Sequence, residues 1–248
     1  MANKSNKNSN QSSHKIPFPL ASLPAVLLPW YDREKRSLPW RDIVMPYRTW
    51  VSEIMLQQTR VQAVLPYFER FMAAAPDVPA LAELAEDRLL SLWQGLGYYS
   101  RARSLQRSAR VMVDQYGGCL PDTYSDLIQL PGIGDYTAGA ILSIAFNKPV
   151  PAVDGNVLRI AARLTACGDN VLDPRTRQHV RDALAAVMPT DRPGDFNQAM
   201  MDLGAAVCLP KNPNCESCPA ASLCAAKAAG LQSRLPVREK IPPSRKRT

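Results

Sequence analysis

The chain has 248 residues, which is enough for one large domain or two small ones around a substantial buried core. Hydrophobic residues make up 46% of it, an ordinary fraction for a globular protein. It has no apolar signal-peptide core at its N-terminus and no uninterrupted apolar stretch long enough to span a membrane. We therefore expect no membrane association and a reducing, cytoplasmic location.

The formal net charge of +8 suggests a nucleic-acid partner, but this charge lies in the two ends of the chain. Residues 1–16 carry a net +3 and residues 231–248 a net +5, so residues 17–230 sum to zero. We expect the first segment to be a disordered basic tail and the second to be a basic tail or linker. Any polyanion site on the body must therefore come from local clustering.

Between the tails, apolar residues recur at three- and four-residue steps with almost no β-type alternation. Short Pro/Gly connectors separate these runs, a pattern typical of an all-α domain with many short helices. The predicted helices, in chain order, are Trp50–Phe71 with an interruption at Pro66, Leu81–Leu92, Ala102–Tyr116, Tyr124–Leu130, Thr137–Phe146, Val157–Ala166, Thr176–Val187 and Phe196–Val207.

The first predicted helix carries Glu53 among apolar neighbours. Glu53 either points to solvent from a polar stripe, or is partly buried with a raised pKa that lets it hold a proton near neutrality. Gln57 and Gln58 follow it, and Tyr98 and Arg101 lie after the next break. Amides and tyrosines beside arginines offer base stacking, hydrogen bonds to base edges and phosphate contacts. The alternative is a solvated basic helix face.

The connector Leu130–Tyr136 lies between two predicted helices and contains Gly132 and Gly134. Two glycines one residue apart let the backbone turn sharply and expose N–H groups at the start of the next helix, where a phosphate is favoured. An ordinary helix–helix turn would use the same residues.

Asp154 lies just before the predicted helix Val157–Ala166. It is expected to be a helix N-cap, a carboxylate that faces a developing positive charge at a cleft, or both. Together with Glu53 it provides two carboxyl groups in different environments, which acid-assisted cleavage of a glycosidic bond needs.

Near the end of the chain, four cysteines are spaced C-x6-C-x2-C-x5-C. In a reducing cytosol such a group indicates metal binding rather than disulfides. Zinc sites usually combine two close pairs, whereas four thiolates at unequal spacing suit a [4Fe–4S] cluster better. Zinc, and no metal at all, stay open as alternatives. The predicted ligands are Cys208, Cys215, Cys218 and Cys224.

The hairpin LPGIG, the aspartate some twenty residues after it and the cysteine spacing resemble those of helix–hairpin–helix DNA glycosylases with an iron–sulfur cluster. The resemblance extends from Trp30 to Cys224. Further strings are similar to those of the MutY-type adenine DNA glycosylases: SEIMLQQT (52–59), GLGYYSRAR (95–103), VDGNV (153–157) and FNQAMMDLGA (196–205).

This resemblance implies a two-lobed, all-α fold. A six-helix barrel lobe with the helix–hairpin–helix would span residues 44–150, and a cluster lobe would combine residues 17–43 with 151–230. The [4Fe–4S] cluster would order the surrounding loops without a redox change in the reaction.

The resemblance also implies roles for the predicted site residues. The target adenine would be flipped into a pocket between the lobes. Glu53 would protonate the adenine and then activate water. Asp154 would stabilise the oxocarbenium-like sugar electrostatically or through a transient covalent bond, and Tyr136 would line the pocket and orient both groups. Gln58 and Tyr98 would wedge into the base stack.

Gln198 is expected to recognise the base edge. Gly132 and Gly134 are expected to hold a phosphate through backbone amides, together with a monovalent cation on the hairpin carbonyls. The expected partner is double-stranded DNA with A:G or A:8-oxoguanine mispairs, bound by a monomer that associates with the nucleoid in a bacterial-type cytoplasm.

Tyr136 occupies the position at which the bifunctional endonuclease III type carries a lysine that forms a Schiff base with the sugar. The resemblance therefore implies a monofunctional glycosylase. MutY-type enzymes usually carry a further C-terminal domain that recognises 8-oxoguanine, and this chain stops at Thr248. We therefore expect a reduced preference for 8-oxoguanine over guanine opposite adenine.

Three alternatives stay open: a mismatch-specific thymine glycosylase, a bifunctional endonuclease III-like enzyme, and a non-catalytic DNA-binding or redox-sensing iron–sulfur protein. Three features favour adenine over thymine: the Gln57–Gln58 pair, the run Asp154-Gly155-Asn156, and Gln198. Tyr136 disfavours the second alternative. The presence of both Glu53 and Asp154 disfavours the third.

Overall fold

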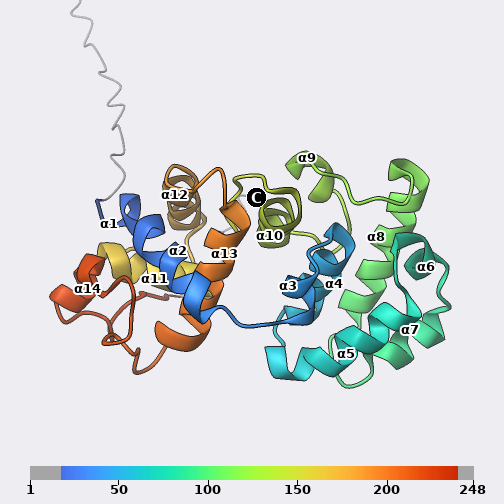
Figure 1. Cartoon of the computed structure of the whole chain (residues 1–248), viewed down its shortest axis with the longest axis horizontal. Helices are drawn as coiled ribbons and strands as arrows, with labels where there is room; N and C mark the ends of the chain where they lie inside the picture. Colours follow the sequence, from blue (N-terminus) through green and yellow to red (C-terminus); the bar gives the residue numbers. More distant parts are fainter. Residues whose placement is uncertain (1–17, 240–248) are drawn as a thin grey trace, which may run out of the picture.

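A computed structural model describes residues 18–239 of the chain. The regular elements in this range are helices, without a strand, which confirms the all-α prediction (Figure 1). None of the helices in this range has the length and apolar character that crossing a bilayer requires. The first helices are α1 (Phe18–Ala21), α2 (Leu23–Glu34), α3 (Pro39–Asp42), α4 (Pro46–Leu56), α5 (Val61–Ala74), α6 (Val78–Glu83) and α7 (Glu86–Trp93).

The helices that follow carry the glycine hairpin and lead to the cysteine loop. They include one π-helical turn, η1, and one 3₁₀ turn, η2. In chain order they are α8 (Ser100–Tyr116), α9 (Tyr124–Leu127), α10 (Asp135–Phe146), α11 (Gly155–Thr165), α12 (Pro174–Ala185), α13 (Pro193–Asp202), η1 (Leu203–Val207), η2 (Ala221–Leu223) and α14 (Ala225–Ala228).

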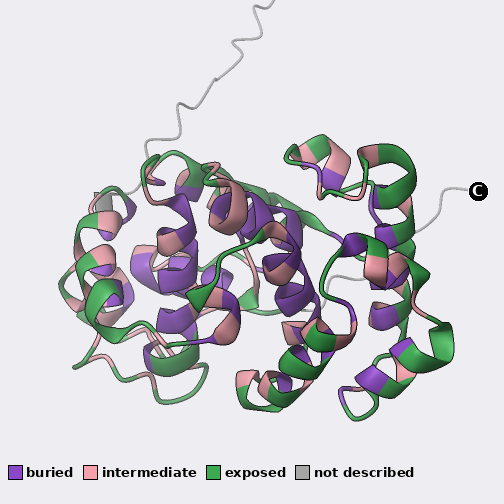
Figure 2. Ribbon diagram, turned by 45° about the vertical axis from the view of Figure 1, so that its right-hand side comes forward, coloured by how far each residue is buried: buried purple, intermediate pink, exposed green. Residues whose placement is uncertain are grey.

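Buried side chains form two main hydrophobic clusters, which divide the molecule into two lobes (Figure 2). The first lobe, α3–α10, surrounds the fully buried Trp50, Phe68 and Trp93. The second lobe combines α1 and α2 with α11–α14, around Leu27 and Phe196. The N-terminal helices therefore complete their core with the last third of the chain. The domain boundaries implied by the resemblance stay a prediction.

Helix α10, the last helix of the first lobe, packs against α4 of its own lobe and against α13 of the second lobe (Figure 1). Close backbone approach fixes this arrangement. A Cβ atom at Gly139 of α10 would lie 2.5 Å from the Pro151 carbonyl oxygen, and one at Gly194 of α13 would lie 2.7 Å from the Ser143 carbonyl oxygen. The absence of a side chain at these two glycines therefore allows the close backbone packing on both sides.

Two helix boundaries differ from the prediction. The break expected at Pro66 is wrong, because Pro66 lies inside α5 and the chain breaks earlier, where Gln58 has a left-handed φ of 58°. The predicted helix Leu81–Leu92 is interrupted at Leu84. The Leu84 carbonyl accepts a hydrogen bond of 2.5 Å from the buried side chain of Gln106 on α8. Apolar periodicity cannot reveal such a long-range contact.

Residues 231–239 pack against the body, which corrects the expectation of a tail or linker from residue 231 onward. Arg163 Nε donates to the Leu235 carbonyl at 3.0 Å, and Val171 N donates to the Val237 carbonyl at 3.1 Å. The Leu235 side chain is buried. The predicted tail at residues 1–16 and the end of the chain at residues 240–248 lie outside the described residues.

Candidate active site

Glu53 is buried because α4 is enclosed on nearly every side. Seven consecutive residues of this helix, 49–55, are buried. Glu53 itself is only 5% exposed. The interpretation of Glu53 as part of a solvated polar stripe is therefore wrong, and the buried alternative is confirmed.

The surroundings of Glu53 favour its protonated form. Burial raises the pKa of Glu53 to about 7, and the negative charge of Asp154 adds to this rise. The Tyr136 hydroxyl and the Arg41 guanidinium act in the opposite direction. Among the described residues, Glu53 Oε2 is buried without a hydrogen-bond partner. This oxygen is therefore available to a bound ligand.

Asp154 is the N-cap of α11, as expected. Its Oδ1 accepts hydrogen bonds from Asn156 N at 2.9 Å and Val157 N at 2.8 Å. Its Oδ2 accepts from the side-chain Nδ2 of Asn156 at 2.8 Å. These three bonds fix the orientation of a half-buried carboxylate.

Glu53 and Asp154 line one cavity of about 550 Å³ between the lobes. Tyr136 from α10 and Gln198 from α13 line the same cavity. Four of the predicted site residues therefore come together in one place. The volume lies within the range of roughly 300–1,000 Å³ that small-molecule sites occupy.

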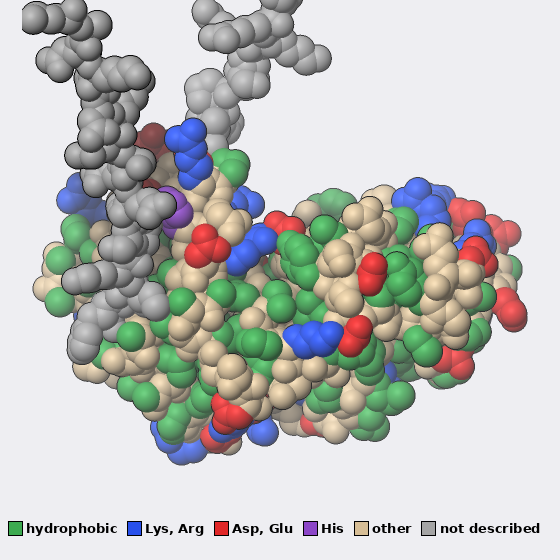
Figure 3. Space-filling model, turned by 90° about the horizontal axis from the view of Figure 1, so that it is seen from above, with side chains coloured by type: hydrophobic (Ala, Val, Ile, Leu, Met, Phe, Trp, Pro, Cys, Tyr) green, Lys and Arg blue, Asp and Glu red, His purple; other side chains and the backbone are tan. Residues whose placement is uncertain are grey.

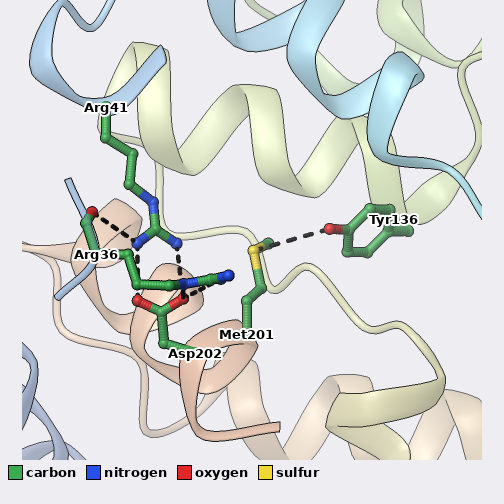
Figure 4. Close-up of polar contacts among 5 residues, drawn as sticks. All are labelled: Arg36, Arg41, Tyr136, Met201 and Asp202. Carbon is green, nitrogen blue, oxygen red and sulfur yellow. Dashed lines mark hydrogen bonds and ion pairs between the residues drawn. The ribbon is translucent and has the colours of Figure 1, made fainter. Parts of the chain in front are cut away.

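Tyr136 and Met201 both line this cavity and contact each other (Figure 4). The Tyr136 hydroxyl donates to Met201 Sδ at 3.8 Å. Burial raises the pKa of Tyr136 well above its ordinary value, and the charge of Glu53 raises it further. The hydroxyl group therefore stays protonated and can serve only as a neutral hydrogen-bonding group.

Two arginines and one aspartate form an ion-pair group at the same cavity (Figure 4). Arg41 donates to the buried Asp202 through Nη1 at 2.7 Å and Nη2 at 3.1 Å. Arg36 donates to Asp202 through Nε at 2.9 Å and Nη2 at 2.5 Å. The group joins α3 of the first lobe to α13 of the second. Sequence reasoning missed it because Asp202 follows Arg41 by 161 positions.

A chain of polar contacts leads from Asp154 toward the cysteine loop. Asn156 Oδ1 accepts from Arg159 Nη1 at 3.0 Å, and Arg159 Nε donates to the Cys208 carbonyl at 2.9 Å. One turn further along α11, Arg163 Nη1 donates to Cys208 Sγ at 3.3 Å. Both arginines are buried. Helix α11 therefore places two guanidinium groups between the cavity and the cysteines, and the apolar pattern of its sequence did not indicate them.

The four predicted cysteine ligands are free thiols whose side chains line one cavity of the second lobe. Burial raises the pKa of the Cys218 thiol to about 11, and nearby Cys208 and Cys224 add to this rise. Within residues 18–239, no group of three or more His, Cys, Asp and Glu side chains is arranged to hold a metal ion. The donor set of four thiols around one cavity nevertheless fits the cysteine ligation of an iron–sulfur cluster, which stays a prediction.

The connector between α9 and α10 is a tight hairpin. Gly132 has a φ of 83°, a conformation that favours glycine, whereas Gly134 caps α10 in extended backbone. Where a Cβ of Gly134 would lie, nothing approaches within 4 Å. Asp135 in the first turn of α10 accepts from Tyr124 Oη at 2.6 Å and from Arg181 Nη2 at 2.5 Å. The helix start is thus held firmly beside open space, as phosphate binding requires.

Gln58 and Tyr98 occupy two exposed turns, and both have left-handed backbones, with φ values of 58° and 50°. Tyr98 is 61% exposed. Gln57 differs from Gln58, because it is half-buried and its Nε2 donates to Thr137 Oγ1 at 3.4 Å. The two protruding side chains are therefore Gln58 and Tyr98, and their wedge role stays a prediction.

Arg101, predicted from the sequence to contact DNA, makes its hydrogen bonds within the protein. Its Nη1 donates to main-chain carbonyls at the end of α4, and its Nη2 donates to the carbonyls of Leu96 and Gly97 at 3.1 and 3.2 Å. The guanidinium group is therefore already committed to the protein itself.

Lys and Arg side chains are scattered over the face seen in Figure 3 and form no broad basic field there. Several described arginines and lysines are paired with acids, such as Arg181 with Asp135 at 2.5 Å and Lys148 with Asp122 at 2.7 Å. Any polyanion contact on this face must therefore use local groups rather than a general positive field.

The chain is similar to known DNA repair proteins. A model of the HhH-GPD superfamily of base excision DNA repair proteins matches residues 51–187. The adenine DNA glycosylase of Rattus norvegicus is 47% identical over 218 residues, covering 84% of this chain and 42% of the relative. The adenine DNA glycosylase of Buchnera aphidicola subsp. Acyrthosiphon pisum is 39% identical over 214 residues, covering 86% of this chain and 61% of the relative.

A solved structure of a thermostable thymine-DNA glycosylase matches with a TM-score of 0.77 and 25% identity, over 85% of this chain and 97% of that chain. The chain thus corresponds to almost the whole of that structure. It spans less than two thirds of the length of the two curated relatives.

Proposed function

Since the chain belongs to the HhH-GPD superfamily of base excision DNA repair proteins, whose helical fold it has, we propose that it removes adenine from DNA. The proposed substrate is adenine mispaired with guanine or 8-oxoguanine in double-stranded DNA. The observation that carries the proposal is one cavity lined both by Glu53, with a pKa of about 7, and by the Asp154 carboxylate. The names of the similar proteins support adenine as the base.

Glu53 is the proposed proton donor. A carboxyl group with a pKa of about 7 is partly protonated at neutral pH and still acidic enough to give its proton away. It protonates a ring nitrogen of the flipped adenine, so that the base leaves as a neutral molecule when the N-glycosidic bond breaks. The Glu53 carboxylate then takes a proton from the water that attacks C1′, which restores the acid.

Asp154 is the proposed electrostatic partner of the sugar. Positive charge develops on the sugar as the glycosidic bond breaks, and a carboxylate already held by three hydrogen bonds needs no reorganisation to stabilise it. Asp154 lines the cavity that also holds Glu53, so both groups can act on one nucleotide.

We propose that the reaction ends at base removal. The position that carries a Schiff-base lysine in the bifunctional type is Tyr136, which has no amine. The protonated Tyr136 hydroxyl instead orients Glu53, because its 3.8 Å contact with Met201 Sδ is weak enough to give way to the Glu53 carboxylate. Strand scission should therefore require later alkali.

The DNA would be held by the hairpin and by the two exposed turns. Gly134 leaves room at the start of α10 for a phosphate. Gln58 and Tyr98 would fill the stack from which the adenine is flipped, and Gln198 in the cavity would contact the base edge. We propose that one copy of the chain binds one mispair.

We further propose that Cys208, Cys215, Cys218 and Cys224 hold a [4Fe–4S] cluster. When bound, such a cluster supplies four covalent anchors to the loop between η1 and α14. Arg163 contributes a hydrogen bond to Cys208 Sγ, and Lys227 Nζ donates to the Cys215 carbonyl at 3.4 Å. These basic side chains would offset the negative charge of the thiolates.

The experiment that tests the proposal uses duplexes with A:G, A:8-oxoguanine, T:G or a damaged pyrimidine, incubated with the chain with and without later alkali. We expect adenine release from the first two duplexes and strand breaks only after alkali. Release of thymine instead, or breaks without alkali, would contradict the proposed substrate or the monofunctional mechanism respectively.

A further inference from the structure

One guanidinium group, that of Arg101 at the start of α8, connects two separate turns of the first lobe. One turn follows α4 and carries Gln58; the other precedes α8 and carries Tyr98. Arg101 Nη1 donates to the carbonyls of Ile54 at 3.0 Å, Met55 at 2.9 Å and Gln57 at 2.5 Å. Arg101 Nη2 donates to Thr59 Oγ1 at 3.2 Å and to the carbonyls of Leu96 at 3.1 Å and Gly97 at 3.2 Å.

This geometry suits an arginine and no other residue. The last carbonyls of a helix have no partner within the helix, and the end of α4 offers two of them to Nη1. A planar guanidinium holds its donors in a rigid fork, whereas a lysine ammonium is a single point at the end of a flexible stem. The Arg101 guanidinium also lies 5.6 Å from the Trp93 ring centre and 5.5 Å from that of Tyr98.

The two turns need external support. Gln58 and Tyr98 both have a left-handed backbone, which costs free energy for any residue other than glycine and persists only where the surroundings hold it. Both side chains are exposed, so packing of the side chains themselves does not supply that support. The hydrogen bonds of Arg101 to the adjacent main chain do.

We propose that Arg101 is a positioning residue that fixes the Gln58 turn and the Tyr98 turn as one rigid unit, so that both side chains enter the DNA together. This inference rests on the proposed function and adds a residue that acts without touching DNA. Among the described residues, Arg101 Nε has no hydrogen-bond partner but is buried, and the two Nη nitrogens are already bonded within the protein. None of the donors of this side chain is therefore both free and accessible to a phosphate.

The test compares Arg101→Met with Arg103→Met on the full chain. Arg103 lies on the same helix and is exposed, and its ion-pair partner among the described residues is the exposed Glu86 at 2.8 Å. Both variants therefore lose one positive charge. Base extrusion is followed by the fluorescence of 2-aminopurine at the target position opposite guanine, and adenine release by single-turnover kinetics. We expect Arg101→Met to slow both by about tenfold or more relative to Arg103→Met.

Salt dependence separates positioning from direct contact. If Arg101 acts through the turns, the slope of log K against log salt for binding is the same in Arg101→Met and Arg103→Met. If Arg101 instead touches a phosphate, only Arg101→Met lowers the slope, by about one. That lower slope would overturn the inference.

A mutant cycle tests the link to the two side chains. In a chain that already carries Gln58→Ala and Tyr98→Ala, Arg101→Met should have little further effect on extrusion, because the side chains that Arg101 positions are already absent. An equally large effect in both backgrounds would overturn the inference. Should Arg101→Met fail to fold, Arg101→Lys replaces it, since lysine keeps the charge but reaches only part of the acceptors.

The same data separate this inference from the proposed function. If the unaltered chain releases no adenine from any duplex, the proposed function fails. If it releases adenine but Arg101→Met behaves like Arg103→Met, the positioning role fails alone.

Discussion

Glu53 and Asp154 reach one cavity from opposite lobes, the first from the middle of α4 and the second from the N-cap of α11. Their environments differ sharply. Glu53 is buried, and one of its oxygens has no partner among residues 18–239, whereas Asp154 accepts three hydrogen bonds. Two carboxyl groups in such different environments suit an acid and an electrostatic stabiliser.

Replacing Glu53 by Gln should remove the proton donor with almost no change in shape. We expect single-turnover adenine release to fall by at least about 100-fold, the usual contribution of general acid catalysis. In the unaltered chain the rate should decline as the pH rises through about 7, because the carboxyl then loses its proton. This decline should be absent from the residual rate of Glu53→Gln. Glu86→Gln, at an exposed position, is the matched control.

Glu53 should also make the stability of the fold depend on pH. Its pKa is raised in the folded state from 4.5 to about 7, so the folded state binds the extra proton between these values. The stabilisation is therefore complete below about pH 4.5 and is lost as the pH rises through about 7. For this buried group, the pKa shift corresponds to roughly 3 kcal/mol of the free energy of unfolding.

The measurement is urea unfolding of both the unaltered chain and Glu53→Gln across this pH range. The free energy of unfolding of Glu53→Gln, relative to that of the unaltered chain, should rise by roughly 3 kcal/mol as the pH increases from about 4 to about 8. A difference in unfolding free energy that stays constant with pH would show that Glu53 ionises normally in the folded protein.

Local strings of residues predicted much of the candidate site. Glu53, the glycine hairpin and the N-cap at Asp154 each have a signature within a few neighbouring residues, and the all-α class follows from periodicity. Burial of Glu53 could not be decided in this way. It depends on α10 packing against α4 from more than eighty residues away.

Contacts between distant residues escaped the sequence analysis for the same reason. The pairing of Arg41 with Asp202 spans 161 positions and leaves no local pattern. The hydrogen bonds of Arg101 within the protein were not predicted, because most of its acceptors are main-chain carbonyls, which every residue has. A side-chain pattern cannot show which carbonyls a fold will leave unpaired.

Two replacements of Asp154 should separate its catalytic role from its capping role. Asp154→Asn keeps an oxygen for Asn156 N and Val157 N, whereas Asp154→Ala loses the cap, which typically costs about 0.5–2 kcal/mol. We expect adenine release to fall to a similar low rate in both variants, because both lose the negative charge. Only Asp154→Ala should show the full loss of stability from the missing cap, measured as the free energy of unfolding in urea. High activity in Asp154→Asn would mean that the charge is not needed.

The cysteine loop gives a prediction about the metal. The purified chain should be brown, with broad absorption near ~400 nm and about four iron atoms per chain. Cys218→Ser should lose this colour and iron, whereas Cys119→Ser, at an exposed free thiol, should keep both. A colourless protein with about one zinc per chain, or one without metal, would refute the cluster.

Removing the Tyr136 hydroxyl should shift the pH dependence of adenine release in a defined direction. In the unaltered chain this hydroxyl lowers the pKa of Glu53 against the effect of burial. In Tyr136→Phe the pKa of Glu53 should therefore rise, and the decline of the rate should move to higher pH. Tyr116→Phe, at the far end of α8, is the control and should leave the pH profile in place. A move to lower pH in Tyr136→Phe would mean that the hydroxyl stabilises protonated Glu53 instead of its carboxylate, and the proposed orienting contact would have to be reversed.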